Sequence, residues 1–188
     1  MSTRPWIRVV DESEATGQLK EIYKEIKKQR GKVSNIMKVH SLNPRAMKAH
    51  MDLYLSLMFG EFGLSREECE LIATVISTVN GCDYCQNHHA EALNRYWKDH
   101  RRIRQLIQDF HAATLPEKAH KMLGYVVKLT KTPSAITQDD IDILRKCGFS
   151  DENILSLNLI TSYFNFVNRI ASGLGVEFTS DEVRGYKY

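Results

Sequence analysis

Two cysteines and a histidine stand close together near the middle of the chain, at Cys82, Cys85 and His89. Cysteines three residues apart can face each other and form a disulfide, and a histidine four residues later lies one turn along the same helix face. Asn80-Gly81 ends the preceding segment, so both cysteines fall in the first turn of a new helix. Free N–H groups and the helix dipole stabilise a thiolate there. The pattern therefore predicts thiol redox chemistry.

A carboxylate on the preceding helix is spaced so that it can contact this cluster. Glu70 precedes Cys82 by twelve residues and shares a helix face with small residues, which lets another helix approach closely. A carboxylate buried in such a contact needs a polar partner. We expect that partner to be His89, whose ring Glu70 would orient and make more basic. The neighbouring His88 points to a different side of the helix.

The spacing of Glu70, eleven residues, Cys82-x-x-Cys85-x-x-x-His89 resembles the core of the AhpD-like alkylhydroperoxidases, which belong to the carboxymuconolactone decarboxylase-like superfamily. Flanking segments at 64–68 and 164–177 extend the similarity to a branch of uncharacterised peroxidase-related proteins. The resemblance covers most of the chain, from about Trp6 to Glu177.

This resemblance implies an all-helical fold, assembly into homo-oligomers such as dimers or hexamers, and a thiol-dependent peroxidase or disulfide reductase. It implies that Cys85 attacks a hydroperoxide, that Cys82 resolves the product as an intramolecular disulfide, and that Glu70 and His89 form the proton relay. An external thiol or dithiol would then reduce the disulfide. The sequence departs from AhpD at Tyr84, where AhpD carries a second relay histidine. Tyr84 and His88 are therefore candidates for supporting roles.

Three alternatives remain open from the residues alone. Position near the helix start favours Cys82 as the more acidic thiol, whereas the histidine spacing and the resemblance favour Cys85, which we prefer. The same cluster, Cys82, Cys85, His89 and Glu70, could instead bind zinc, although a second ligand pair from another segment is missing. The chain could also be a non-redox, decarboxylase-like enzyme of the same superfamily. No glycine-rich phosphate loop is present, and we expect no organic cofactor.

Capping residues and apolar periodicity predict an all-α helical bundle of about seven or eight helices, a single domain over residues 1–188. The expected helices are 13–30, 44–59, 65–80, 82–97, 101–112, 116–131, one from 137, and one from 150 to about 173–175. In the second of these we expect Leu53, Leu57 and Met58 to face inward. Segments 71–79 and 154–174 almost lack charge, which predicts that they form the centre. The polar tail after about Val176 is expected to be loosely held unless a partner subunit orders it.

The composition is that of a globular protein, with 43% hydrophobic and 26% charged residues and a formal net charge of +3. The basic run at 98–104 is interrupted, which favours a solvated helix face over a nucleic-acid site. No apolar run reaches the ~20 residues that span a membrane, and no signal core is visible, so we expect a cytoplasmic location without membrane partners. Close cysteines there indicate catalysis or metal binding, whereas Cys69 and Cys147 are expected to be structural.

Overall fold

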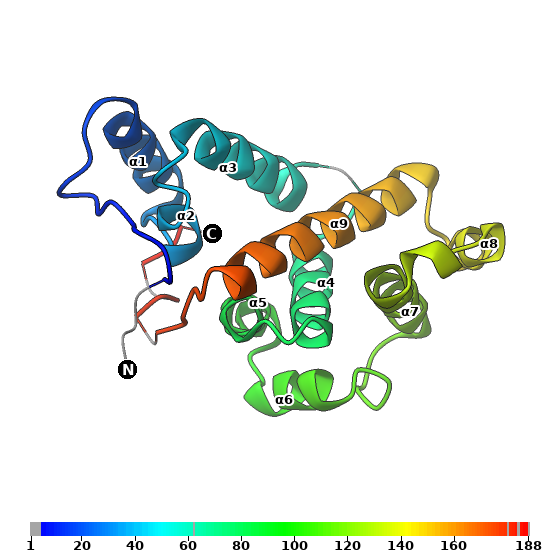
Figure 1. The fold of residues 1–188 in the computed structure, drawn as a ribbon. Coiled ribbons are helices and arrows are strands. Elements are labelled where there is room, and N and C mark those ends of the chain that lie inside the picture. The colour runs from blue at the N-terminus through cyan, green and yellow to red at the C-terminus, as the bar shows by residue number, and fades with distance from the viewer. Residues whose placement is uncertain (1–4, 62, 180, 184, 188) are drawn as a thin grey trace.

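The computed structural model describes residues 5–61, 63–179, 181–183 and 185–187. Within these residues it contains α-helices and one short 3₁₀ helix but no strand, which confirms the all-α prediction (Figure 1). Eight of the nine described α-helices have seven or more residues. The helices are α1 (Gly17–Arg30), α2 (Asn35–Lys38), α3 (Pro44–Phe59), α4 (Arg66–Val79), α5 (Asp83–Trp97), α6 (His100–Gln108), α7 (Glu117–Lys131), α8 (Gln138–Lys146) and α9 (Asp151–Gly173), with η1 at Pro133–Ala135.

The helix starts follow local side-chain chemistry. Ser65 and Glu68 form a reciprocal capping box at α4, and Ser150 and Asn153 form another at α9. Asn43 caps α3 by accepting a hydrogen bond from the backbone of Ala46. These short-range signals satisfy backbone donors that the helix itself leaves open, which is why the sequence predicted those starts well.

Three local predictions are wrong. The first helix begins at Gly17 instead of Ser13, and the fifth ends at Gln108 instead of about 112. On α3, Leu53 is 46% exposed, whereas Met47 and Met51 are buried. Leu53 lies almost opposite Met51 around the helix, so the two cannot both face the core. Met58 is buried and Leu57 packs partly buried against the core, as predicted, so only Leu53 of the three faces outward.

The α4 helix lies at the centre of the bundle. It packs against α5, α7 and α9, and every residue from Cys69 to Ser77 is buried. The long α9 helix crosses the middle of the molecule over α4 (Figure 1). The two segments that nearly lack charge therefore form the core, as the hydropathy pattern predicted.

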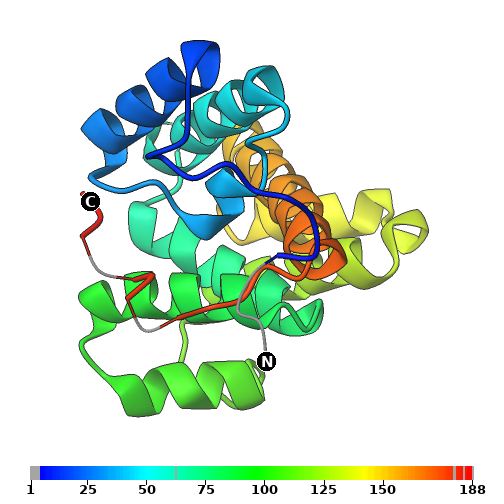
Figure 2. The ribbon, with the colours of Figure 1, turned by 60° about the vertical axis from the view of Figure 1, so that its left-hand side comes forward.

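Both ends of the described chain are attached to the bundle. After α9 the chain turns back along α5 toward α1 (Figure 2), where Lys187 N–H donates to the Arg30 carbonyl over 2.8 Å. At the other end, Trp6 N–H donates to the Leu174 carbonyl, and the indole lies where a side chain on Gly175 would stand. Among the described helices, none combines the length and the apolar character needed to cross a membrane.

Candidate active site

A tight corner between α4 and α5 places the two cysteines. Asn80 ends α4, and Gly81 adopts a φ of +63°, a left-handed conformation that glycine accepts without strain. Cys82 is then the N-cap of α5, and its backbone N–H donates to the Ser77 carbonyl over 2.9 Å. The cysteines occupy the first turn of the helix, as Asn80-Gly81 had indicated.

The two thiols interact with each other, and once one of them ionises they share the remaining proton. The hydrogen bond from Cys85, together with one from Ser172, lowers the pKa of Cys82 to about 7 against the effect of burial. The same contact and burial raise the pKa of Cys85, which Asn168 offsets only in part. In the reduced protein the charge therefore resides on Cys82 and the proton on Cys85, the assignment that the helix dipole alone favoured.

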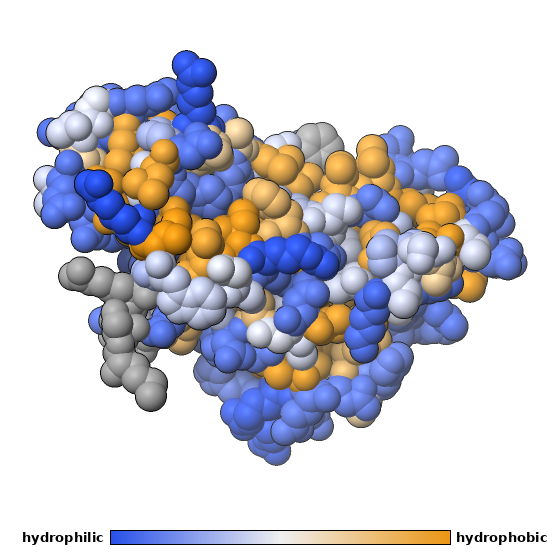
Figure 3. Space-filling model, in the orientation of Figure 1, coloured by the Kyte–Doolittle hydropathy of each residue, from blue (hydrophilic) through white to orange (hydrophobic). Residues whose placement is uncertain are grey.

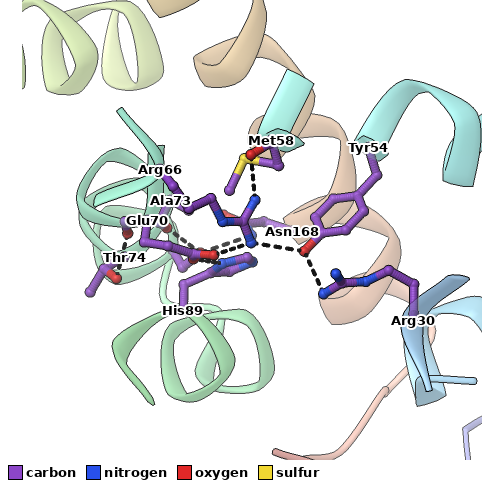
Figure 4. Close-up of polar contacts among 10 residues, drawn as sticks. Arg30, Tyr54, Met58, Arg66, Glu70, Ala73, Thr74, His89 and Asn168 are labelled. Carbon is purple, nitrogen blue, oxygen red and sulfur yellow. Dashed lines mark hydrogen bonds and ion pairs between the residues drawn. The ribbon is translucent and has the colours of Figure 1, made fainter. Parts of the chain in front are cut away.

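A chain of charge-assisted hydrogen bonds runs from Arg66 through Glu70 to His89 (Figure 4). His89 Nδ1–H donates to Glu70 Oε2 over 2.7 Å, and Arg66 Nη2 donates to Oε1 over 2.5 Å. Arg66 is itself anchored by the Met58 carbonyl at 2.7 Å. The structure thus brings together Glu70 and His89, the pair predicted from helix geometry.

The Glu70 side chain is only 1% exposed yet remains ionised. Burial raises its pKa, but the hydrogen-bonded His89, with further contributions from Arg66 and Arg30, lowers that pKa overall. An ionised carboxylate only accepts hydrogen bonds, so His89 must carry its proton on Nδ1. The lone pair of the neutral ring is then on Nε2, and that nitrogen can take a proton.

Most of the predicted site residues line one cavity of about 80 Å³. Its walls include Cys85, His89, Glu70, Tyr84 and His88. No hydrogen bond is described between Cys85 and His89, so a proton transfer between them would need a water or substrate that bridges the cavity.

Cys82 opens to a different side of the bundle. It lines a second cavity, of about 480 Å³, together with Trp6, Ser172 and Phe178. Cys85 is not among the residues of that cavity, and Cys82 is not among those of the first. Cys82 and Cys85, although they interact with each other, therefore line two separate cavities.

Tyr84, which replaces the relay histidine of AhpD, makes structural contacts. Its hydroxyl donates to Glu182 over 2.8 Å and accepts from the Ile36 backbone N–H at 3.1 Å. Both functions of the hydroxyl are used, so Tyr84 anchors the C-terminal segment. The His88 ring stacks near Tyr84, and its Nε2 lies 3.6 Å from Glu182. Burial lowers the pKa of His88, which keeps the ring neutral.

Sequence reasoning missed three residues that support the site: Arg66, Asn168 and Glu182. Arg66 carried a readable signal, because it lies four residues before Glu70 on one helix face. Asn168 and Glu182 come from distant segments, and no local pattern connects them with the cysteines. Cys69 is buried with a pKa raised to about 12, mainly by burial and only secondarily by Glu70 and Glu68, which agrees with a structural role.

Within the part of the chain that the structure describes, no three His, Cys, Asp or Glu side chains are grouped as ligands for a metal ion. The cluster at Cys82, Cys85, His89 and Glu70 instead makes hydrogen bonds within two pairs: thiol with thiol and carboxylate with imidazole.

Comparison with known proteins shows which proteins the chain resembles in sequence and in fold. Residues 44–112, which include the whole cysteine and histidine cluster, match the carboxymuconolactone decarboxylase family. A solved uncharacterized peroxidase-related protein from Silicibacter sp. TM1040 is 27% identical, covering 97% of this chain and 93% of its own, with a TM-score of 0.81. The chain thus contains a segment similar to the carboxymuconolactone decarboxylase family and shares its overall fold with AhpD-like proteins.

Other solved structures share the AhpD-like fold. An uncharacterized peroxidase-related protein from Ralstonia eutropha JMP134, described as an alkylhydroperoxidase AhpD core, is 24% identical over 95% of this chain and 94% of its own, with a TM-score of 0.86. The debrominase Bmp8, solved with 2,3,4-tribromopyrrole, is 17% identical over 93% of this chain and 91% of its own, with a TM-score of 0.76. No curated protein matches significantly.

Proposed function

We propose that this AhpD-like chain is a cysteine-based peroxidase that reduces hydroperoxides at the Cys82–Cys85 pair. The observation that carries the proposal is the cavity that Cys85 and His89 both line, with the His89 ring held by Glu70 and that carboxylate held by Arg66. A thiol, a basic nitrogen and a second thiol in hydrogen-bond contact are the groups that peroxide reduction by a dithiol requires.

The first step uses the proton on Cys85. His89 Nε2 takes this proton through a bridging water, and the Cys85 thiolate attacks the distal oxygen of the hydroperoxide ROOH. The O–O bond breaks, RO⁻ leaves and takes the proton from the His89 imidazolium, and Cys85 becomes a sulfenic acid. The negative charge of Glu70 stabilises the imidazolium between these two proton transfers.

The second step uses the charge on Cys82. With a pKa lowered to about 7, Cys82 already carries thiolate when it attacks the sulfenic sulfur of Cys85. The S–S bond forms, hydroxide leaves and takes a proton from solvent to become water. Two external thiols or one dithiol then return two electrons and two protons, and Cys82 releases one of these protons to solvent as it becomes a thiolate again.

The proposal is tested by consumption of cumene hydroperoxide with glutathione or dithiothreitol as reductant. We expect Cys85→Ser to abolish consumption and Cys82→Ser to stop turnover after one equivalent. Cys147→Ser, remote from both cavities, is the matched control and should retain full activity. Glu70→Gln should lower kcat/KM about ten- to a hundredfold, because the imidazolium loses its counter-charge.

Peptide mass spectrometry after one turnover should find a disulfide between Cys82 and Cys85. Full peroxide consumption by Cys85→Ser would remove the proposal. An unaltered protein that consumes no peroxide, but removes halogen or carboxylate from a small molecule, would point to the other chemistries of the superfamily.

We further propose that the chain assembles into a homo-oligomer. The α9 helix exposes Leu155, Leu159 and Phe166 on one face, and Leu53 of α3 is also exposed. Figure 3 shows apolar side chains gathered over α3 and the first half of α9. Large apolar side chains clustered on a surface are typical of a protein–protein interface.

A further inference from the structure

A second chain of hydrogen bonds reaches the cavity of Cys85, through residues that the mechanism above does not use. It links Tyr163 of α9, His50 of α3 and His40, which follows α2. The Tyr163 hydroxyl lies 2.8 Å from His50 Nε2, His50 Nδ1 lies 3.3 Å from His40 Nε2, and His40 Nδ1 lies 2.8 Å from the Ile36 carbonyl oxygen. Tyr163 and His50 are buried and line the cavity.

The chain has only one consistent arrangement of protons. The Ile36 carbonyl can only accept, so His40 carries its hydrogen on Nδ1 and presents a lone pair on Nε2. His50 must then donate from Nδ1 and accept at Nε2. Both rings are neutral, because burial lowers the pKa of His40 and lowers that of His50 to about 3. The donor to His50 Nε2 is therefore the Tyr163 hydroxyl.

The direction of this hydrogen bond determines whether the Tyr163 hydroxyl presents a donor or an acceptor to the cavity. Its only hydroxyl hydrogen is directed at His50, so the oxygen presents a lone pair and no hydrogen to a bound molecule. Burial raises the pKa of Tyr163, and the charges of Tyr54 and then of Cys85 add to this effect. A hydrogen-bond acceptor thus lines the same cavity as the attacking sulfur of Cys85.

We propose that Tyr163 accepts the O–H hydrogen of the hydroperoxide and holds its distal oxygen against Cys85, with His50 as the residue that fixes the direction of the tyrosine hydroxyl. The inference rests on the proposed peroxidase function and specifies its substrate class: peroxides that keep an O–H group. In ROOH the oxygen that the thiolate attacks is the one bearing this hydrogen. The hydrogen stays on that oxygen as it becomes the sulfenic S–O–H, so the same acceptor serves before and after the step.

The test compares hydroperoxide with an electrophile that has no hydrogen to donate. Tyr163→Phe keeps the ring and removes the acceptor. We expect its kcat/KM for cumene hydroperoxide to fall about three- to tenfold, the loss of one neutral hydrogen bond. The rate at which methyl methanethiosulfonate modifies Cys85, measured in a Cys82→Ser background so that the more acidic thiol cannot react first, should stay unchanged. Di-tert-butyl peroxide, which lacks an O–H group, should be a poor substrate of both proteins.

Two substitutions at His50 distinguish the effect of hydrogen-bond direction from the effect of side-chain packing. His50→Gln can still accept from Tyr163 and donate to His40, and should retain the rate with hydroperoxide. His50→Leu frees the hydroxyl hydrogen to turn into the cavity and should lose as much as Tyr163→Phe. ¹⁵N NMR of the unaltered protein should find His50 protonated on Nδ1.

The outcomes distinguish this inference from the proposed function. An unaltered protein that consumes no hydroperoxide overturns both. Normal peroxide consumption by Tyr163→Phe, an equal fall in both rates, or His50 protonated on Nε2 overturns the role of Tyr163 alone. Thermal melts of each variant report whether the fold is retained.

Discussion

The hydroxyl of Tyr84 donates a 2.8 Å hydrogen bond to the carboxylate of Glu182, across 98 residues of sequence. Glu182 is 3% exposed and also accepts the Asn35 backbone N–H at 2.6 Å. Burial raises the pKa of this carboxyl, but His88, the Asn35 N–H and the Tyr84 hydroxyl lower it overall. Lys32 lies 3.6 Å from the same carboxylate. The residue that would be a relay histidine in AhpD thus secures the end of this chain over the cavity.

Removing the tyrosine hydroxyl should loosen this segment. We expect Tyr84→Phe to lower the free energy of unfolding by about 1–3 kcal/mol, because a buried carboxylate loses a donor. Urea denaturation measures the loss. Carboxypeptidase should also shorten the variant faster than the unaltered protein. Tyr96→Phe, at a half-exposed tyrosine on α5, is the control and should change neither measurement.

The pair formed by Arg66 and Glu70 should show strong energetic coupling. Arg66→Met leaves Glu70 buried with less compensation, and should destabilise the protein by about 3–5 kcal/mol. Adding Glu70→Gln should recover part of that loss, because no charge is then left unpaired. Lys48→Met, which breaks exposed pairs with Glu25 and Asp52, is the control and should leave the free energy of unfolding nearly unchanged. Additive losses from Arg66→Met and Glu70→Gln would contradict the coupling.

The acidity of Cys82 predicts how the reduced protein responds to pH. Its pKa in the folded chain, about 7, is below the ordinary value of 9.0, so ionisation adds stability as pH rises from 7 to 9. That stability is lost as pH falls through 7. Urea denaturation of the reduced protein between pH 6 and 9 should show the gain, and Cys82→Ser should abolish it.

Alkylation measures the same pKa directly. The iodoacetamide labelling rate of the Cys82 peptide should rise with a midpoint near pH 7, and Ser172→Ala should move this midpoint upward. Cys69, with a pKa raised to about 12, is the internal reference and should stay unlabelled over this range. A midpoint for Cys82 near 9 would contradict the sharing of one proton with Cys85.

The exposed stripe on α9 predicts the behaviour of the chain in solution. Leu159→Glu places a charge among Leu155 and Phe166 and should shift the molar mass measured by light scattering toward that of one chain. Glu152→Gln, at the exposed start of the same helix, should leave the molar mass unchanged. A single-chain mass for the unaltered protein would contradict assembly through this surface.

Sequence patterns predicted the parts of the fold that depend on near neighbours. The capping boxes at Ser65 and Ser150 and the left-handed Gly81 are local devices, and each stands where the sequence indicated. The four-residue α2 helix was missed because it is too short for apolar periodicity to develop. Leu53 was placed inward because hydrophobicity alone does not tell which of two apolar faces a neighbouring helix covers.

The candidate site likewise contains residues that local spacing could pair and residues that only the tertiary fold brings together. Glu70 and His89 could be paired because their spacing places them on facing positions of consecutive helices. The sharing of a proton between Cys82 and Cys85 depends on Ser172 and Asn168 of α9, far away in sequence. The contact of Tyr84 with Glu182 and that of Tyr163 with His50 likewise require the tertiary fold. Such partners become visible only when the helices are packed.

The opening of Cys82 and Cys85 into different hollows has a practical consequence for chemical labelling. A mixed disulfide or fluorescent tag on Cys82 would project toward Trp6 and leave the space beside His89 unobstructed. The same group on Cys85 would fill that space. A single bulky reagent, directed to one sulfur or the other, can therefore block either entrance of the site on its own.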